Sequence, residues 1–181
     1  MIRKTLPCQS LIALVLVLAT AALADDGRGG DSLRGEKYQL ALAKTYNMQA
    51  HDHARMLDKY AALGERVPAD VVKEHAAAIR FNANAARKSF AKLGETANNP
   101  ALAGQFAQMQ QRLNKVTELA DRLEAQVEQE GSGESQLVGS QSAEISRQLR
   151  ANHVDAQEAD GNFYGSDSES YYFTGEGHFV D

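Results

Sequence analysis

The sequence has no tryptophan, one cysteine and three prolines among its 181 residues. The cysteine, Cys8, lies near the start, ahead of an apolar run. The rest of the chain therefore has no thiol for a disulfide, a thiolate metal site or a covalently attached haem of the C-x-x-C-H type. Aromatic residues make up only 7% of the chain, whereas alanine is abundant. This composition favours helices packed through small side chains over a sheet with a large aromatic core.

Only one segment is apolar over a long run, residues 11–23, and it follows the basic residues Arg3 and Lys4. Residues 22–24 (Ala-Leu-Ala) place small side chains where a signal peptidase cleaves. The sequence therefore predicts a secretory signal over residues 1–24, a secreted or periplasmic mature chain and no membrane insertion after cleavage. The alternative is an uncleaved membrane anchor, but the run is short for a bilayer span.

Acidic and basic residues balance over most of the chain, and an excess of acids appears only at its end. Residues 25–130 hold 15 acidic and 15 basic side chains, whereas residues 131–181 hold nine acids and two arginines. A neutral body with an acidic end lacks the basic patch that phosphate binding requires. We therefore expect no nucleic-acid partner and no attraction to an anionic membrane surface.

Glycine and proline mark where helices are expected to end and begin. A first helix is predicted over residues 32–63, ended by Gly64, and a second over residues 69–93, ended by Gly94. Both ends rest on the same reasoning, because a glycine in the left-handed conformation often terminates a helix. The short connection between them predicts that these two helices run antiparallel.

The third helix has the clearest pattern. It begins with Asn99 as a cap and Pro100 at the first helical position, where the missing N–H is harmless. Its apolar residues then recur at steps of four and three: Leu102, Phe106, Met109, Leu113, Val116, Ala120, Leu123 and Val127. This period is typical of helices that pack at shallow angles in bundles. If the chain itself leaves one side of this stripe uncovered, we expect it to bind a partner helix or a second copy.

The same steps in the first helix indicate which of its residues face the core. They select Leu42, Tyr46, Gln49, His53, Met56, Tyr60 and Leu63. Tyr46 and Tyr60 are therefore expected in the core, together with Phe90 and Phe106 of the next two helices.

These elements predict an all-α fold, an antiparallel helical bundle of three long helices plus a shorter fourth over about residues 140–156. Residues 25–31 are predicted to be a flexible lead-in, and residues 32–158 the bundle domain. Residues 159–181, rich in glycine, serine, acids and aromatics, are predicted to be a loose, disordered acidic tail.

Methionine and histidine side chains, which can bind metal ions, cluster in the first two predicted helices. Four of them lie within nine residues and one lies on the next helix: Met48, His51, His53, Met56 and His75. Thioether and imidazole groups suit copper, and imidazole also suits zinc.

Helical geometry weakens the case for a metal site. His51 and His53 are two residues apart, so they point to different sides of the helix. A tight hairpin would separate His53 from His75 by about 8 to 9 Å along the axis. In the alternative interpretation, His53 and His75 are hydrogen-bonded packing residues with Asn82 and Tyr60 as partners.

No motif of a known enzyme class occurs, neither a phosphate-binding glycine loop nor G-x-S-x-G nor H-E-x-x-H. We therefore expect no enzyme activity. The sequence favours an exported helical bundle with a structural or protein-interaction role, acting on a protein partner or by self-association through its helices. The alternative is a periplasmic bundle that binds copper or zinc through the five histidine and methionine side chains named above.

Overall fold

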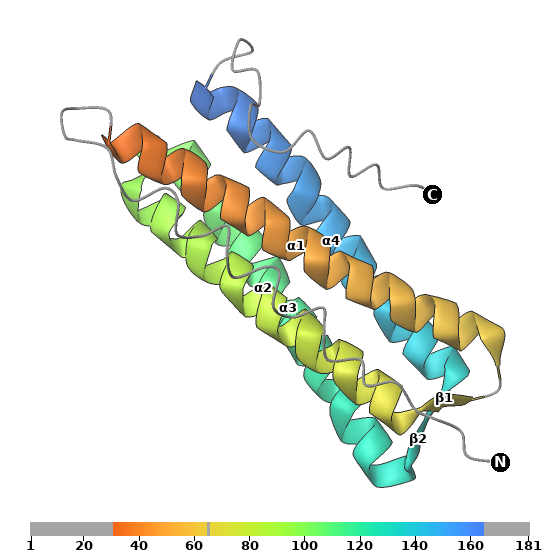
Figure 1. Cartoon of the computed structure of the whole chain (residues 1–181). Coiled ribbons are helices and arrows are strands. Elements are labelled where there is room, and N and C mark those ends of the chain that lie inside the picture. Colours follow the sequence, from red (N-terminus) through yellow and green to blue (C-terminus); the bar gives the residue numbers. More distant parts are fainter. Residues whose placement is uncertain (1–30, 65, 165–181) are drawn as a thin grey trace, which may run out of the picture. The chain divides into compact units, whose positions relative to one another are not determined.

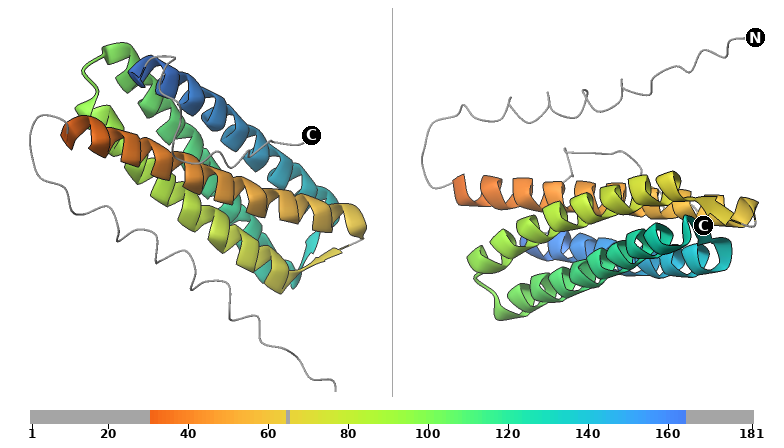
Figure 2. Two further views of the ribbon diagram at one scale, coloured as in Figure 1. Left: turned by 45° about the horizontal axis from the view of Figure 1, so that its top comes forward. Right: turned by 90° about the horizontal axis from the view of Figure 1, so that it is seen from below.

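The computed structural model describes residues 31–64 and 66–164, and helices account for nearly all of them. The bundle consists of α1 (Asp31–Leu63), α2 (Ala69–Thr96), α3 (Pro100–Glu130) and α4 (Ser135–Tyr164), with two three-residue strands, β1 (Arg66–Pro68) and β2 (Ser132–Glu134). Figures 1 and 2 show the four helices side by side. The predicted all-α helical bundle is therefore confirmed.

Each helix runs antiparallel to the next, and α1 also packs against α4. Lys44, early in α1, pairs with Asp160 near the end of α4, with 2.9 Å between Nζ and Oδ2. At the other end of α1, a Cβ placed on Gly139 would lie 3.4 Å from Cβ of Ala61. Because the start of one helix meets the end of the other, α1 and α4 are antiparallel, and α1 lies between α2 and α4 (Figure 1).

The two strands join the α1–α2 and α3–α4 connections at one end of the bundle. They pair antiparallel, with Val67 opposite Gly133. Gly131 ends α3 in the left-handed conformation, with φ of 71°, and its N–H donates to the carbonyl of Val127. Gly133 has no space for a side chain, because a Cβ there would lie 2.6 Å from Cγ2 of Val138. Glycine is therefore required at both positions, one for its conformation and the other for its packing.

The contact between α2 and α3 holds the largest buried side chains. The rings of Phe90 and Phe106 stack with centroids 6.0 Å apart. All eight residues of the predicted α3 stripe are buried: Leu102, Phe106, Met109, Leu113, Val116, Ala120, Leu123 and Val127. The cap is also as predicted, since the side chain of Asn99 accepts a hydrogen bond from the N–H of Ala101. The α3 stripe is thus covered within the chain.

The predicted fourth helix was too short. α4 has 30 residues, close to the 31 of α3, and includes residues 159–164, which were assigned to the tail. Gly139 and Gly161, which flank the predicted range, both lie inside α4. Val138 and Ala159 are buried near its two ends. Burial of such side chains outweighs the cost of about 1 kcal/mol that glycine imposes within a helix.

The predicted stripe of α1 was rotated away from the actual one. Tyr60 and Met56 are exposed, and Tyr46 is only partly buried. The buried residues of α1 are small or polar for the most part: Leu40, Ala43, Asn47, Ala50, His51, Ala54 and Leu57. The prediction followed the large side chains, whereas close helix packing selects alanine. Similarly, α2 does not end at Gly94 but continues to Thr96.

The predicted signal at residues 1–24, most of the lead-in and the tail beyond Tyr164 lie outside the described residues. Within the described part, none of the helices has both the length and the hydropathy needed to cross a membrane.

Candidate functional site

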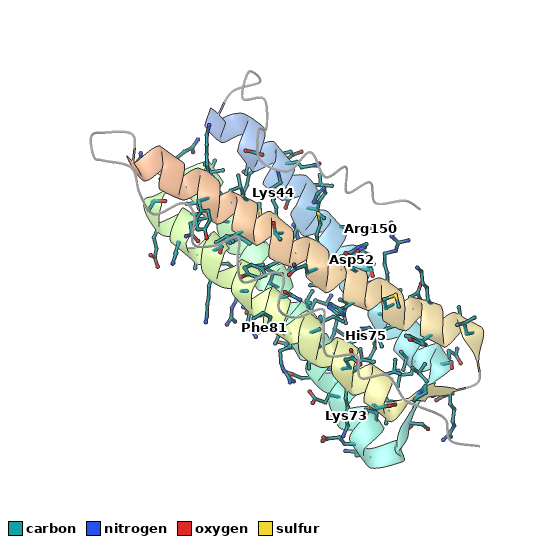
Figure 3. All side chains as sticks on the ribbon, viewed as in Figure 1. Lys44, Asp52, Lys73, His75, Phe81 and Arg150 are labelled. Atoms are coloured by element: carbon teal, nitrogen blue, oxygen red, sulfur yellow. The ribbon has the colours of Figure 1, made fainter. Side chains whose placement is uncertain are left out.

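Two histidines meet where α1 packs against α2. Nδ1 of His53 lies 2.9 Å from Nδ1 of His75, and the ring centroids are 5.2 Å apart. At this distance, Nδ1–H of one ring donates to the lone pair of the other, so the pair cannot hold a proton on both Nδ1 atoms. Both side chains are partly exposed, and Figure 3 shows His75 beside α1.

The predicted separation of 8 to 9 Å between these histidines was therefore wrong, and so was Asn82 as the partner of His53, whose ring meets His75. The connection after Leu63 is not a tight turn: β1 runs back as an extended strand before α2 begins at Ala69. Three extended residues span about 10 Å, which shifts α2 along α1 by more than one helical turn. Tyr60 lies beside His75 as predicted, with 6.0 Å between ring centroids, but this is a ring contact, and the hydrogen bond of His75 is with His53.

Burial keeps both imidazoles in the neutral form that binds metals. It lowers the pKa of His53, while the nearby carboxylates of Asp52 and Glu74 act in the opposite direction. It also lowers the pKa of His75, as does His53, and Glu74 again opposes the change. The two rings are thus neutral near pH 7 with negative charge beside them, which favours a cation.

The nitrogen separation suits a shared metal ion. With metal–nitrogen bonds of about 2.0 to 2.1 Å, two nitrogens 2.9 Å apart subtend about 90° at the metal. This is the angle between neighbouring ligands in a square-planar copper(II) site. A tetrahedral zinc ion needs roughly 3.3 Å between nitrogens, which requires the rings to move apart by only a few tenths of an ångström.

Met56 and Tyr60 flank the pair on α1. Met56 follows His53 by three residues, so both side chains lie toward one side of the helix. Met56 is 39% exposed and Tyr60 is 37% exposed. The imidazole pair is therefore bordered by accessible apolar side chains, one of which carries a soft sulfur.

The structure places His51 and Met48 apart from this pair. His51 is 2% exposed, and its Nε2 lies 3.5 Å from Nε of Arg150 on α4, from which it accepts a long hydrogen bond. Burial, then Arg150, Arg55 and His153, lowers the pKa of His51 to about 4. Met48 is half-buried, three residues before His51. A guanidinium beside His51 repels a cation, so only His53, His75 and Met56 belong to the candidate site.

A polar layer where α4 packs against α1 and α3 was not expected from the sequence. Nδ2 of Asn47 donates to the carbonyl of Leu149 over 2.8 Å, and Nδ2 of Asn152 donates to that of Met109 over 3.1 Å. Asn47, His51, Ser142 and Asn152 are all buried. Single polar residues at apolar positions were the available signal, but the sequence does not show which helix each one faces.

Within the described residues, no three or more histidine, cysteine, aspartate or glutamate side chains gather closely enough to hold a metal ion. The candidate site therefore has two imidazole ligands from one chain. Comparisons of the chain with protein-family models, with curated proteins and with solved structures found no significant match.

Proposed function

We propose that this protein is an exported helical bundle that binds a copper(II) or zinc ion through Nδ1 of His53 and Nδ1 of His75. The observation that carries the proposal is the 2.9 Å between these two atoms, which belong to different helices. Neutral rings and the nearby carboxylates of Asp52 and Glu74 support it. For both Nδ1 atoms to bind the metal, the ring that carries its hydrogen on Nδ1 changes to the tautomer with the hydrogen on Nε2, so that each ring stays neutral and offers its Nδ1 lone pair.

Copper(II) is the favoured ion. In the general order of divalent metals, nitrogen ligands bind copper(II) more tightly than they bind zinc. The angle of about 90° that the two nitrogens subtend at the metal also matches the square-planar geometry of copper(II). The thioether of Met56 is a further ligand for copper in its reduced state. Export, which residues 1–24 predict, would bring the protein to a compartment where it meets free copper, and it remains a prediction.

A role in protein interaction remains a prediction as well. The α3 stripe that motivated it is buried within the described bundle, so it offers no surface for a partner helix.

Competition titration tests the metal site. An untagged full chain carrying Cys8→Ser and His178→Gln, which remove ligands outside the described residues, is titrated with copper(II) and zinc against a chromophoric chelator. His53→Gln and His75→Gln should each weaken binding by more than about tenfold. His153→Gln, on α4, is the matched control and should bind as the parent does. Equal affinity in all four proteins would refute the proposal.

A further inference from the structure

The imidazole pair leaves the coordination of a metal ion incomplete. Zinc and copper(II) take at least four ligands in protein sites, and the described part of one chain brings two histidines together. We infer that a second copy of this chain supplies the remaining ligands, so that one ion is held by His53 and His75 of both copies. This inference rests on the proposed metal site and adds its partner.

The surface beside the pair suits such a contact. Three exposed apolar residues follow each other along α1 at steps of four and three, Met56, Tyr60 and Leu63, with exposed fractions of 39%, 37% and 83%. This row borders the histidine pair, because the ring of Tyr60 lies against that of His75. A two-fold axis through the metal would bring the row of one copy toward that of the other and remove apolar surface from water.

The charges make this contact depend on the metal. Asp52 and Glu74 directly precede His53 and His75 in the sequence, and both are exposed. Two copies would bring four carboxylates toward one point, where they repel each other in the absence of a cation. A divalent ion between the copies offsets that repulsion, so the metal-free chain is expected to stay monomeric.

Sedimentation velocity with metal titration tests the inference on the same Cys8→Ser, His178→Gln chain. In EDTA the chain should sediment as a monomer. Zinc should convert it to a dimer that is complete at one ion per two chains, and EDTA should reverse the change. His53→Gln and His75→Gln should remain monomeric with zinc, whereas His153→Gln should dimerise like the parent.

Two results separate failure of this inference from failure of the proposed function. A monomer that binds one ion per chain through His53 and His75 would overturn the dimer and leave the metal site standing. Absence of histidine-dependent binding would overturn both. A zinc-dependent dimer that persists in His53→Gln would also refute the shared site.

A variant outside the ligand set tests the apolar row. Leu63→Glu puts a charge on the row without touching the imidazoles, and its 83% exposure makes the fold tolerant of the change. It should weaken zinc-dependent dimerisation several-fold. Dimerisation equal to that of the parent would remove the row from the interface.

Discussion

The α2–α3 pair and the α1–α4 pair are built from different side chains. Between α2 and α3, stacked Phe90 and Phe106 lie among large aliphatic residues. α1 and α4 bring a larger share of alanines to the core and also carry most of the buried polar residues: Asn47, His51, Ser142 and Asn152 on these helices, against Asn82 and Ser89 on α2. The first pair gains mainly from burial of apolar surface, whereas the second depends on hydrogen bonds that fix how its helices meet.

The difference indicates where chemistry can reside. The contact between α2 and α3 is mainly apolar, and His75 of α2 meets α1 instead. α1 carries polar groups on both of its sides, with His51 facing Arg150 of α4 and His53 facing His75 of α2. Figure 3 shows His75 and Arg150 on opposite sides of α1. α1 thus separates a histidine beside a guanidinium from a histidine that pairs with a second imidazole.

Removal of a large ring from the α2–α3 contact should have the largest effect. Phe106→Ala should lower the free energy of unfolding by about 3 to 5 kcal/mol, because Phe106 is fully buried against Phe90 and the cavity cannot collapse completely. Urea denaturation followed by circular dichroism measures it. Leu63→Ala is the exposed control and should change stability little. A loss below about 1 kcal/mol in Phe106→Ala would show that this pair is not the main source of stability.

Acid should weaken the side of α1 that faces α4. The folded-state pKa of His51 is about 4 and its ordinary value is 6.5, so the unfolded chain takes up the proton first. The stability that depends on neutral His51 is complete above pH 6.5 and is lost as the pH falls toward 4. The loss amounts to roughly 3 kcal/mol at 1.36 kcal/mol per pKa unit.

Urea denaturation in EDTA across this pH range checks the effect. His51→Leu removes the titrating group, so its stability should depend on pH less steeply, by close to one proton, than that of the parent chain. The two proteins are compared by the slope of the free energy of unfolding against pH, because the substitution also changes the stability itself at every pH. Identical slopes in the two proteins would show that His51 does not titrate in this way.

Replacement of two buried asparagines should have different effects on the stability of the bundle. Asn152 donates to Met109 and accepts from Arg112, so Asn152→Leu should destabilise the bundle by about 1 to 3 kcal/mol. Oδ1 of Asn47 is buried without a hydrogen-bond partner. Asn47→Leu therefore removes an unsatisfied group together with one hydrogen bond, and its effect should be close to zero. Thermal denaturation of both variants compares them, and an equal loss in each would contradict this account of the polar layer.

A surface ion pair on the α2–α3 side should matter least. Nζ of Lys73 lies 3.2 Å from Oε1 of Glu128, with both side chains largely exposed. Glu128→Gln should cost less than about 1 kcal/mol, and less still in high salt. Urea denaturation at two ionic strengths measures it. A loss as large as that of Asn152→Leu would mean that exposed charges, rather than buried contacts, hold these helices together.

The sequence predicts a helix well where large apolar residues carry the period. In α3, an unbroken series from Leu102 to Val127 and a cap at Asn99 left one interpretation, and each of these residues lies as expected. In α1, alanines form the core while tyrosines lie at the edge, so hydrophobicity favoured the wrong face. In α4, buried Val138 and Ala159 lie outside the predicted range of residues 140–156, and the helix continues through Gly139 and Gly161.

The candidate site was predicted in its residues but not in its geometry. His53, His75 and Met56 were named, yet their register depends on β1, which pairs with β2 more than sixty residues away in the sequence. No local pattern shows that pairing. The prediction that His51 and His53 lie on different sides of α1 followed directly from their spacing, because residues two apart on a helix point to different sides.

The most direct test of the central claim is nitrogen-15 NMR of the histidine rings in the full chain, recorded before and after addition of zinc. We expect Nδ1 of His53 and Nδ1 of His75 to shift together to values typical of metal-bound nitrogen, while the rings of His51 and His153 stay unchanged. Unshifted Nδ1 signals from the pair, or coordination at His51 in its place, would contradict the account.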